Sequence, residues 1–253
     1  MNITWDAQGY TDGFSFVYRF GEAVLSLLDA PQGSFVVDLG CGNGALTQQL
    51  AQRGYRALGV DASQEMLDKA RALHPELTFA QGDATALSLD EPADAIFSNA
   101  VFHWIDAEKQ PQLAASVAAA LRPGGQLVCE FGGFGCAGHV HAALERAFER
   151  RGLVYPRTFY FPTIGQYAPV LERAGLRVTH AQLFDRPTPQ LPEVGLRGWI
   201  AMFVTAPFVG MDAPLREAIV SEAEDELRSI LLRADGAWII DYVRIRLRAV
   251  KAA

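Results

Sequence analysis

The sequence predicts a doubly wound α/β fold, with a Rossmann-like, mostly parallel sheet of seven strands and an antiparallel last strand. Between residues 35 and 131, short apolar runs alternate with helical patterns. These runs are apolar throughout, which is typical of parallel strands that helices cover on both faces. The chain of 253 residues, half of them hydrophobic, is long enough for one such domain with an elaboration.

The elements follow one another in a regular order. Ser63 is a suitable N-cap, with Glu65 in the first turn of its helix, and the turn 122–125 ends a later helix before the fifth strand. Strands are expected at 35–39, 55–60, 77–81, 94–99, 126–131, 177–184 and 238–250. Helices are expected at 45–53, 63–73, 107–121, 139–151 and 163–174.

A long helical segment, at about 187–236, separates the last two strands. It contains Trp199 and Phe203 and is too long for a plain loop. We therefore expect a helical cap over the ligand crevice.

Composition excludes several classes of protein. The net charge of -7 and the lack of a Lys/Arg cluster argue against nucleic-acid binding. Arg244, Arg246 and Arg248 recur with a period of two and are interpreted as one solvated strand face. The odd cysteine count, without metal-like pairing, favours a reducing cytoplasm, and no signal or membrane-spanning segment is recognised.

A glycine loop follows the first strand in "VVDLGCGNGALTQQL". Gly40 and Gly42 match the dinucleotide fingerprint, with Asp61 following at about the distance of a ribose ligand. Asp38, however, would repel a pyrophosphate and attract a cation, by about 4 kcal/mol of gross Coulomb energy at about 4 Å and an effective dielectric near 20. S-adenosylmethionine, which carries an ammonium and a sulfonium and no phosphate, fits this charge better.

Two further carboxylates end the next strands. Asp61 can accept both ribose hydroxyls, and Asp83 can accept from the adenine amino group. Three acids at three successive strand ends, beside a glycine loop, predict an adenosyl site.

The segments "VVDLGCGNGALTQQL", "LGVDAS", "QGDATAL", "DAIFSNAVFHWI" and "LRPGGQLVCEF" resemble the motifs of class I S-adenosylmethionine-dependent methyltransferases. The N-terminal segment and "AVFHWI" are similar to those of the small-molecule methyltransferases related to trans-aconitate methyltransferase, which methylate carboxylate oxygen. The resemblance implies a cofactor site made of Asp38, Gly40, Cys41, Gly42, Asn43, Gly44, Asp61, Ala62, Met66, Gly82, Asp83, Ala84, Asn99 and Ala100.

The resemblance also implies a single methyltransferase domain over residues 1–253. Its parts are an N-terminal helical lid (1–33) with Tyr10 and Phe16 at the cofactor, a cofactor-binding core (34–132), and an acceptor-side half (133–253).

The acceptor side is less defined. His103 follows the fourth strand and is a candidate base, or alternatively an orienting residue, because a carboxylate acceptor needs no base. Arg157, Arg186 and Arg197 could clamp an acidic acceptor, although a surface position is favoured for each. Candidate substrate residues are Trp104, Glu130, Tyr160, Trp199 and Phe203.

We therefore expect methyl transfer from S-adenosylmethionine, which becomes S-adenosylhomocysteine, to a small molecule, at carboxylate oxygen. Carbon or another oxygen is the alternative acceptor. An NAD-dependent oxidoreductase and a non-catalytic cofactor-binding protein are the competing classes. Metal, nucleic-acid and membrane partners are not expected, and the protein is expected to be a monomer or homodimer.

Overall fold

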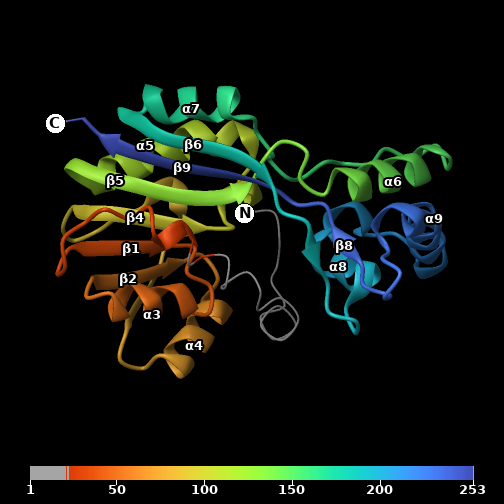
Figure 1. Cartoon of the computed structure of the whole chain (residues 1–253), viewed down its shortest axis with the longest axis horizontal. Coiled ribbons are helices and arrows are strands. Elements are labelled where there is room, and N and C mark those ends of the chain that lie inside the picture. The colour runs from red at the N-terminus through yellow and green to blue at the C-terminus, as the bar shows by residue number, and fades with distance from the viewer. Residues whose placement is uncertain (1–20, 22, 253) are drawn as a thin grey trace.

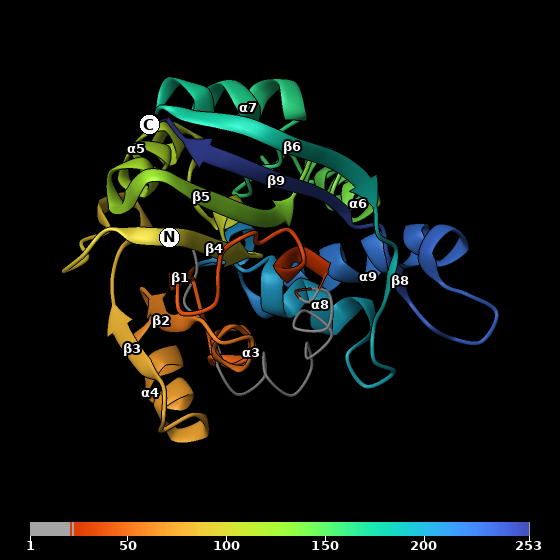
Figure 2. The same cartoon turned by 60° about the vertical axis from the view of Figure 1, so that its left-hand side comes forward.

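A computed structural model describes residues 21 and 23–252 of the chain, so Tyr10 and Phe16 lie outside the described residues. Its main sheet has seven strands in the order β3-β2-β1-β4-β5-β9-β6 (Figures 1 and 2). The strands are β1 (Phe35–Leu39), β2 (Arg56–Asp61), β3 (Thr78–Gln81), β4 (Ala93–Asn99), β5 (Leu121–Gly132), β6 (Leu176–Asp185) and β9 (Val243–Lys251).

Strand directions confirm the predicted fold class. The pairs among β1 to β5 are parallel, whereas β9 runs antiparallel to both of its neighbours, β5 and β6. Parallel strands end at the same edge of the sheet, so the loops after β1, β2, β3 and β4 come together there.

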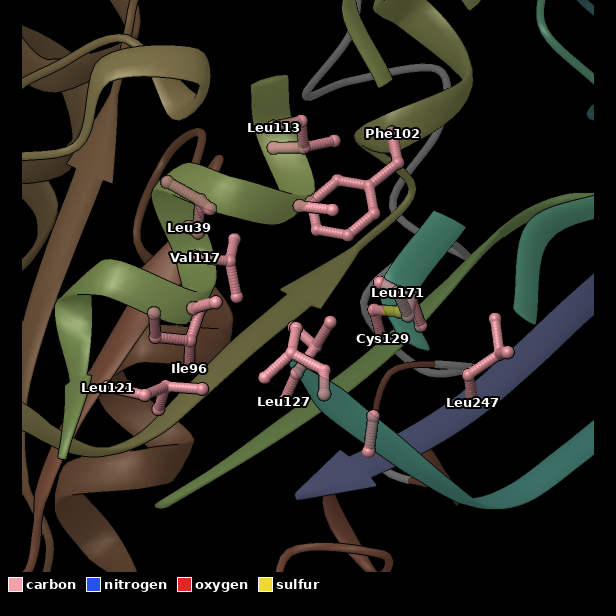
Figure 3. Packing of buried hydrophobic residues seen from close by; sticks show 14 of the residues in the cluster. Leu39, Ile96, Phe102, Leu113, Val117, Leu121, Leu127, Cys129, Leu171 and Leu247 are labelled. Carbon is pink, nitrogen blue, oxygen red and sulfur yellow. The ribbon is translucent and has the colours of Figure 1, made fainter. Parts of the chain in front are cut away.

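Helices cover both faces of the sheet. On one face lie α5 (Gln110–Ala120) and α7 (Ile164–Arg173); on the other lies α3 (Ala45–Gln52), and α4 (Gln64–Leu73) packs beside β2 and β3. Figure 3 shows Leu39, Ile96 and Leu127 of the sheet beside Leu113 and Val117 of α5. These five side chains are fully or almost fully buried, so the continuous apolar runs form the predicted core.

A second lobe lies at the carboxyl-end side of the sheet (Figure 1). It contains α6 (Gly138–Glu149), α8 (Gly195–Phe203), α9 (Ala213–Leu231), the short pair β7 (Thr188–Pro189) and β8 (Ile239–Ile240), and the single turn η4 (Ala206–Phe208). The sequence predicts a helical cap at about 187–236. In the structure α6, which follows β5, also belongs to this lobe, because it packs against α9 and shares its buried core.

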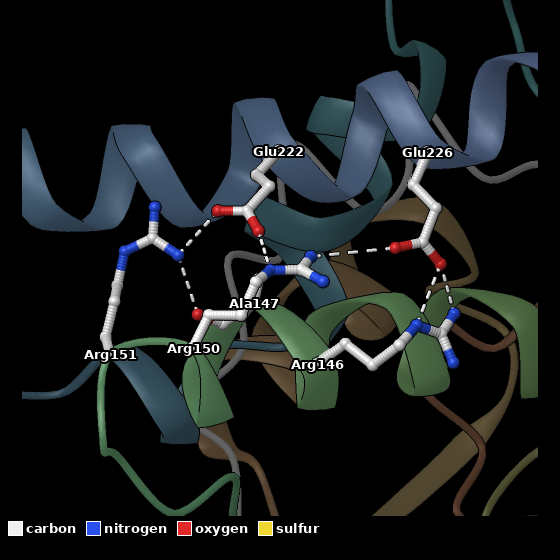
Figure 4. A network of polar contacts seen from close by, with 6 residues as sticks. All are labelled: Arg146, Ala147, Arg150, Arg151, Glu222 and Glu226. Atoms are coloured by element: carbon white, nitrogen blue, oxygen red, sulfur yellow. Dashed lines mark hydrogen bonds and ion pairs between the residues drawn. The ribbon is translucent and has the colours of Figure 1, made fainter.

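Ion pairs join α6 to α9 along their exposed sides (Figure 4). Arg146 pairs with Glu226, and Arg150 and Arg151 pair with Glu222. Because these groups are partly solvated, each pair contributes about 0.2–1 kcal/mol at most, and the apolar contacts dominate the stability of the lobe.

The last strand is divided, contrary to the prediction of one strand over 238–250. β8 pairs with β7 in a separate small sheet, and β9 begins at Val243. Between them the Asp241 carboxylate accepts hydrogen bonds from the backbone and side chain of His139, and Tyr242 is buried in the second lobe. These contacts hold the chain out of the main sheet at this point.

The arginine face of β9 is also different from the prediction. Arg244 is buried, Arg246 pairs with the buried Glu130 at 2.6 Å, and Arg248 pairs with Asp29 at 3.1 Å. β9 lies inside the sheet, between β5 and β6, so both of its edges are paired. The side chains of Arg246 and Arg248 are only 15% and 28% exposed, so the arginine face is not the solvated face that was predicted. Among the described residues, no helix combines the length and the apolar character that crossing a bilayer requires.

Candidate active site

The carboxyl ends of β1 to β4 line an open cleft with about 540 Å³ of empty space, including its solvent-filled mouth. Segments from all four strand ends contribute to it, as the fold rule for parallel sheets predicts. Six residues predicted from the sequence line it: Gly40, Asp61, Ala62, Gly82, Asp83 and Ala84. Val101, Ile105 and Lys109, which were not predicted, complete the wall on the side of β4.

Asp61 lies at the end of β2 with both carboxylate oxygens in hydrogen bonds. Oδ2 accepts from the Gly42 N–H at 2.9 Å, and Oδ1 accepts from the Ser63 N–H at 2.8 Å. Burial raises the pKa of Asp61, and these backbone hydrogen bonds oppose the shift. Each oxygen keeps a second lone pair, so Asp61 can still accept from ligand hydroxyls in the cleft.

Asp83 occupies the corresponding place after β3 and is exposed. Its Oδ1 accepts from the backbone N–H and the side-chain hydroxyl of Thr85, both at 2.8 Å, and these bonds lower its pKa. The carboxylate therefore stays ionised, and its other oxygen remains available to an amino group.

Two glycines of the loop have positive φ angles and no room for a side chain. At Gly40, φ is 79°, and an added Cβ would lie 2.2 Å from Cγ2 of Val101. At Gly44, φ is 83°, and an added Cβ would lie 2.7 Å from Cζ of Phe79. Packing of the loop against its own neighbours thus requires these glycines, in addition to any close approach by a ligand.

Asp38 lies behind the loop and does not line the cleft. Its side chain is buried, and its Oδ2 accepts a hydrogen bond from Thr47 Oγ1 at 2.6 Å. Burial raises the pKa of Asp38 to about 7; the Thr47 hydrogen bond opposes this shift, and the charge of Asp61 adds to it. A buried carboxylate near neutrality responds strongly to any cation brought close to it.

The remaining loop residues are mostly packed inside. Asn43 Oδ1 accepts from the Ala45 N–H at 3.3 Å, Met66 is buried, and burial raises the pKa of the Cys41 thiol, as expected for a packing residue. Asn99 ends β4 without lining the cleft. No group of three or more potential metal ligands occurs in the described part of the chain.

A second, partly open cavity lies beside the first, with about 480 Å³ of empty space when its open mouth is included. Residues 100–105 contribute to both: Val101 and Ile105 line the first, and Ala100, His103 and Trp104 line the second. The other lining residues come mainly from the second lobe: Cys136, Ala137, His141, Phe159, Phe161, Trp199, Phe203, Tyr242 and Arg244. A ligand in this cavity would therefore be only one chain segment away from a ligand in the first.

His103 is buried in the wall of the second cavity, and its Nδ1 accepts a hydrogen bond from the Gly132 N–H at 3.2 Å. This bond assigns the ring proton to Nε2, which has no hydrogen-bond partner among the described residues. Burial, with the nearby Arg244 charge, lowers the pKa of His103 well below its usual value. The ring is consequently neutral and offers an N–H donor, which fits the orienting role better than the role of a base.

Arg244 is the charged residue of this cavity that sequence reasoning discounted. It is only 7% exposed, its Cζ lies 4.6 Å from the centre of the Tyr242 ring, and its buried Nε has no hydrogen-bond partner. No acid pairs with it among the residues that the structure describes. The period of two correctly places Arg244 on the same strand face as Arg246 and Arg248. The sequence pattern does not show that this face is buried at Arg244, because the burial comes from the tertiary structure.

Other predicted acceptor residues lie elsewhere. Glu130 is buried away from the cavity, where Arg186 and Arg246 pair with it at 2.7 and 2.6 Å, so Arg186 is no free surface group. Tyr160 packs against Tyr167, with ring centres 6.2 Å apart. The extended segment alternates, so Phe159 and Phe161 line the cavity instead. Trp104, Trp199 and Phe203, which the sequence offered as candidate substrate residues, lie in the wall of this cavity.

Arg157 and Arg197 have acidic partners. Arg157 pairs with Glu145 at 2.6 Å, and Arg197 pairs with Glu217 at 2.7 Å and with Glu224 at 2.5 Å. Neither is available as a free clamp in this structure.

Comparison with known proteins shows which enzymes the chain resembles. The family described as a methyltransferase domain matches residues 36–125, which carry the glycine loop and the acidic strand ends. An uncharacterized methyltransferase of Schizosaccharomyces pombe is 28% identical over 98% of both chains. The chain is an S-adenosylmethionine-dependent methyltransferase. S-adenosylmethionine is thus its cofactor, and the oxidoreductase alternative is wrong.

Two further similarities extend over most of the methyltransferase. A trans-aconitate 2-methyltransferase of Variovorax paradoxus is 28% identical over 93% of each chain. A solved structure from Bacillus halodurans C-125, provisionally described as a methyltransferase, has a TM-score of 0.65 and 15% identity, and covers 92% of this chain and 98% of its own. The second likeness supports the fold of the enzyme.

Proposed function

We propose that the enzyme transfers the methyl group to a carboxylate oxygen of a small-molecule acceptor in the second cavity. The observation that carries this proposal is Arg244, a buried guanidinium that lines the cavity with no acidic partner among the described residues. An unpaired buried charge is costly, and a carboxylate is the anion whose geometry a guanidinium matches. The relative from Variovorax paradoxus is named for trans-aconitate, which is itself a carboxylate.

The cofactor side follows from the cleft. We place Asp61 at the ribose hydroxyls, Asp83 and Ala84 at the adenine edge, and the loop 40–44 with Asp38 near the methionine end. The residues present fit such a ligand, because Asp61 and Asp83 keep free lone pairs and Asp38 is a buried acid next to the loop. Residues 34–132 would then hold the cofactor, and residues 133–253 would supply most of the acceptor cavity.

The reaction needs little from the protein beyond binding and orientation. Bound S-adenosylmethionine supplies an electrophilic methyl group on a sulfonium. A carboxylate oxygen would form a bond to the methyl carbon while the bond from that carbon to sulfur breaks, and the electron pair of the broken bond would stay on sulfur. No proton moves, so the absence of a base at His103 is no obstacle. Arg244 would orient the carboxylate, and the Nε2–H of His103 would donate to it.

The test of this proposal is the chemical nature of the product. The purified enzyme is incubated with methyl-labelled S-adenosylmethionine and small carboxylic acids, and the product is then treated with mild base. A methyl ester releases labelled methanol, as the proposal expects, whereas label that resists hydrolysis would indicate transfer to carbon, nitrogen or another oxygen and would overturn it.

The His103→Ala substitution is expected to lower kcat/KM for the acceptor about 10- to 100-fold, because one hydrogen bond to a charged group is lost. At saturating cofactor, the wild-type kcat should stay flat between pH 6 and 8.5, because the depressed pKa keeps His103 neutral throughout. Steady-state kinetics across this range test both points. A wild-type kcat that rises with pH and loses this rise in His103→Ala would instead indicate a base.

Cofactor affinity is expected to fall as the pH falls below about 7. Burial raises the pKa of Asp38 to about 7, so at lower pH the free enzyme carries a proton on this carboxyl group. Binding of a ligand that brings its ammonium group close to Asp38 must displace this proton. Affinity should then fall by up to about tenfold per pH unit, and should level off above pH 7, where Asp38 is already ionised. Calorimetric titration with S-adenosylhomocysteine, in two buffers of different ionisation enthalpy, counts the released proton. Asp38→Asn should lose this proton release; if it keeps it, Asp38 is not the responsible group.

A further inference from the structure

Among the described residues that line it, the second cavity, which is the proposed acceptor cavity, combines one unpaired cation, Arg244, with an otherwise apolar, aromatic wall. We infer that its substrate is a monocarboxylic acid with an apolar body, aromatic or alkyl, rather than a dicarboxylate or tricarboxylate. This inference rests on the proposed function and specifies its substrate class.

The number of cations in the cavity wall limits the number of carboxylates that a bound substrate can carry. Among the described residues that line this cavity, Arg244 alone carries a positive charge. The cavity also contains His103 and His141, but both are neutral: burial lowers the pKa of His103 well below its usual value and that of His141 to about 4. A second or third carboxylate would therefore have no cation to pair with, which makes its transfer from water unfavourable.

The neighbouring cations do not change this count. Arg186, beside Arg244, pairs with Glu130 at 2.7 Å and does not line the cavity. Arg157 lines an adjoining cavity but pairs with Glu145 at 2.6 Å. Recruiting either arginine would break an existing ion pair.

Aromatic rings form most of the remaining wall. Phe159 and Phe161 are stacked with their centres 5.2 Å apart and their planes 7° apart. The ring centres of Trp104 and Phe159 are 4.8 Å apart, and those of Trp199 and Phe203 are 5.5 Å apart. Such a surface gains free energy from contact with an apolar body. Its phenylalanine rings offer no donor to an extra carboxylate, and the Trp199 Nε1–H already donates to the Tyr242 hydroxyl.

His141 adds one uncharged polar point. Its Nδ1 is 2.7 Å from the Tyr155 hydroxyl, and its buried Nε2 has no hydrogen-bond partner. It can therefore accommodate a neutral polar atom of the substrate, but it cannot replace a cation.

The test compares three acids as methyl acceptors at saturating S-adenosylmethionine: 3-phenylpropanoate, hexanoate and trans-aconitate. We expect kcat/KM for 3-phenylpropanoate or hexanoate to exceed that for trans-aconitate by at least about 100-fold, measured as base-labile methyl ester. Equal or faster methylation of trans-aconitate would overturn this inference and leave the proposed function intact. If none of the three acids yields an ester, both are overturned.

A variant makes the test independent of absolute rates. Phe203→Arg adds a second cation to the cavity wall, at a half-buried position, and should shift the ratio of kcat/KM toward trans-aconitate by at least about tenfold. Ile230→Arg, at an exposed site on α9, is the matched control and should leave the ratio unchanged. An unchanged ratio in a folded Phe203→Arg would contradict the inference. Should that variant fail to fold, calorimetric titration of the wild-type complex with S-adenosylhomocysteine decides the question, because 3-phenylpropanoate should bind more tightly than trans-aconitate.

Discussion

Replacing Arg244 by methionine is expected to lower kcat/KM for a carboxylic acid by about 100- to 1000-fold. Methionine keeps much of the apolar stem but removes the guanidinium, so the carboxylate would lose its cation inside a largely apolar cavity. Truncating one partner of a buried charge pair costs about 2–5 kcal/mol, or about 30- to 4000-fold, and the expected loss lies in the middle of this range. The measurement is steady-state kinetics with a carboxylic acid that the wild type methylates.

The matched control for this variant is Arg248→Met. Arg248 lies on the same face of β9, but pairs with Asp29 outside the cavity, and its loss should change kcat/KM less than twofold. Affinity for S-adenosylhomocysteine should be nearly the same in both variants, because neither side chain lines the cofactor cleft. An Arg244→Met enzyme that keeps wild-type kcat/KM would show that Arg244 does not bind the acceptor.

The cleft at the carboxyl ends of the strands was predictable because the information for it is local in the sequence. Each of Asp61 and Asp83 ends an apolar run, and parallel strands must bring such ends to one edge of the sheet. The lining of the cleft by both acids follows from that rule. The sequence did not show that packing requires glycine at positions 40 and 44. Gly40 lies against Val101 and Gly44 against Phe79, and the sequence alone does not show that these segments are neighbours.

The lining of the second cavity depends on contacts between segments that are distant in the sequence. A period of two puts Arg244 and Arg246 on one face of a strand, but whether water covers that face depends on where β9 inserts in the sheet. Glu130, which neutralises Arg246, is 116 residues away in the chain. Such a partner cannot be recognised without the sheet order, so a buried arginine was interpreted as a solvated one.

Side-chain direction in the extended segment 158–162 posed the same problem. The sequence offers three consecutive aromatic residues there, and alternation allows either Tyr160 or its two neighbours to face the cavity. The Tyr160 N–H donates to the carbonyl of His103, and its ring packs on Tyr167, which turns Phe159 and Phe161 toward the cavity. Tertiary hydrogen bonding therefore selects the lining residues.

The Asp61→Ala substitution is expected to weaken binding of S-adenosylhomocysteine by about 100-fold or more. Two ribose hydroxyls would lose a charged acceptor, and a hydrogen bond to a charged group contributes about 1.5–3 kcal/mol. The Gly42 and Ser63 N–H groups would also lose their acceptor, which loosens the glycine loop. Calorimetric titration measures the change, with Asp68→Ala, at an exposed acid of α4, as the control that should bind normally.

The 2′-deoxy analogue of S-adenosylhomocysteine separates the two ways in which Asp61 could support ligand binding, namely hydrogen bonding to the ribose and positioning of the glycine loop. If Asp61 accepts from the ribose, the wild type should bind the analogue about tenfold more weakly than the full ligand, whereas Asp61→Ala should bind both ligands equally. If Asp61 acts only by holding the loop, through its bonds to Gly42 and Ser63, the wild type and Asp61→Ala should discriminate between the two ligands to the same extent. Equal discrimination would therefore remove Asp61 from the ribose site and leave it a loop-positioning residue.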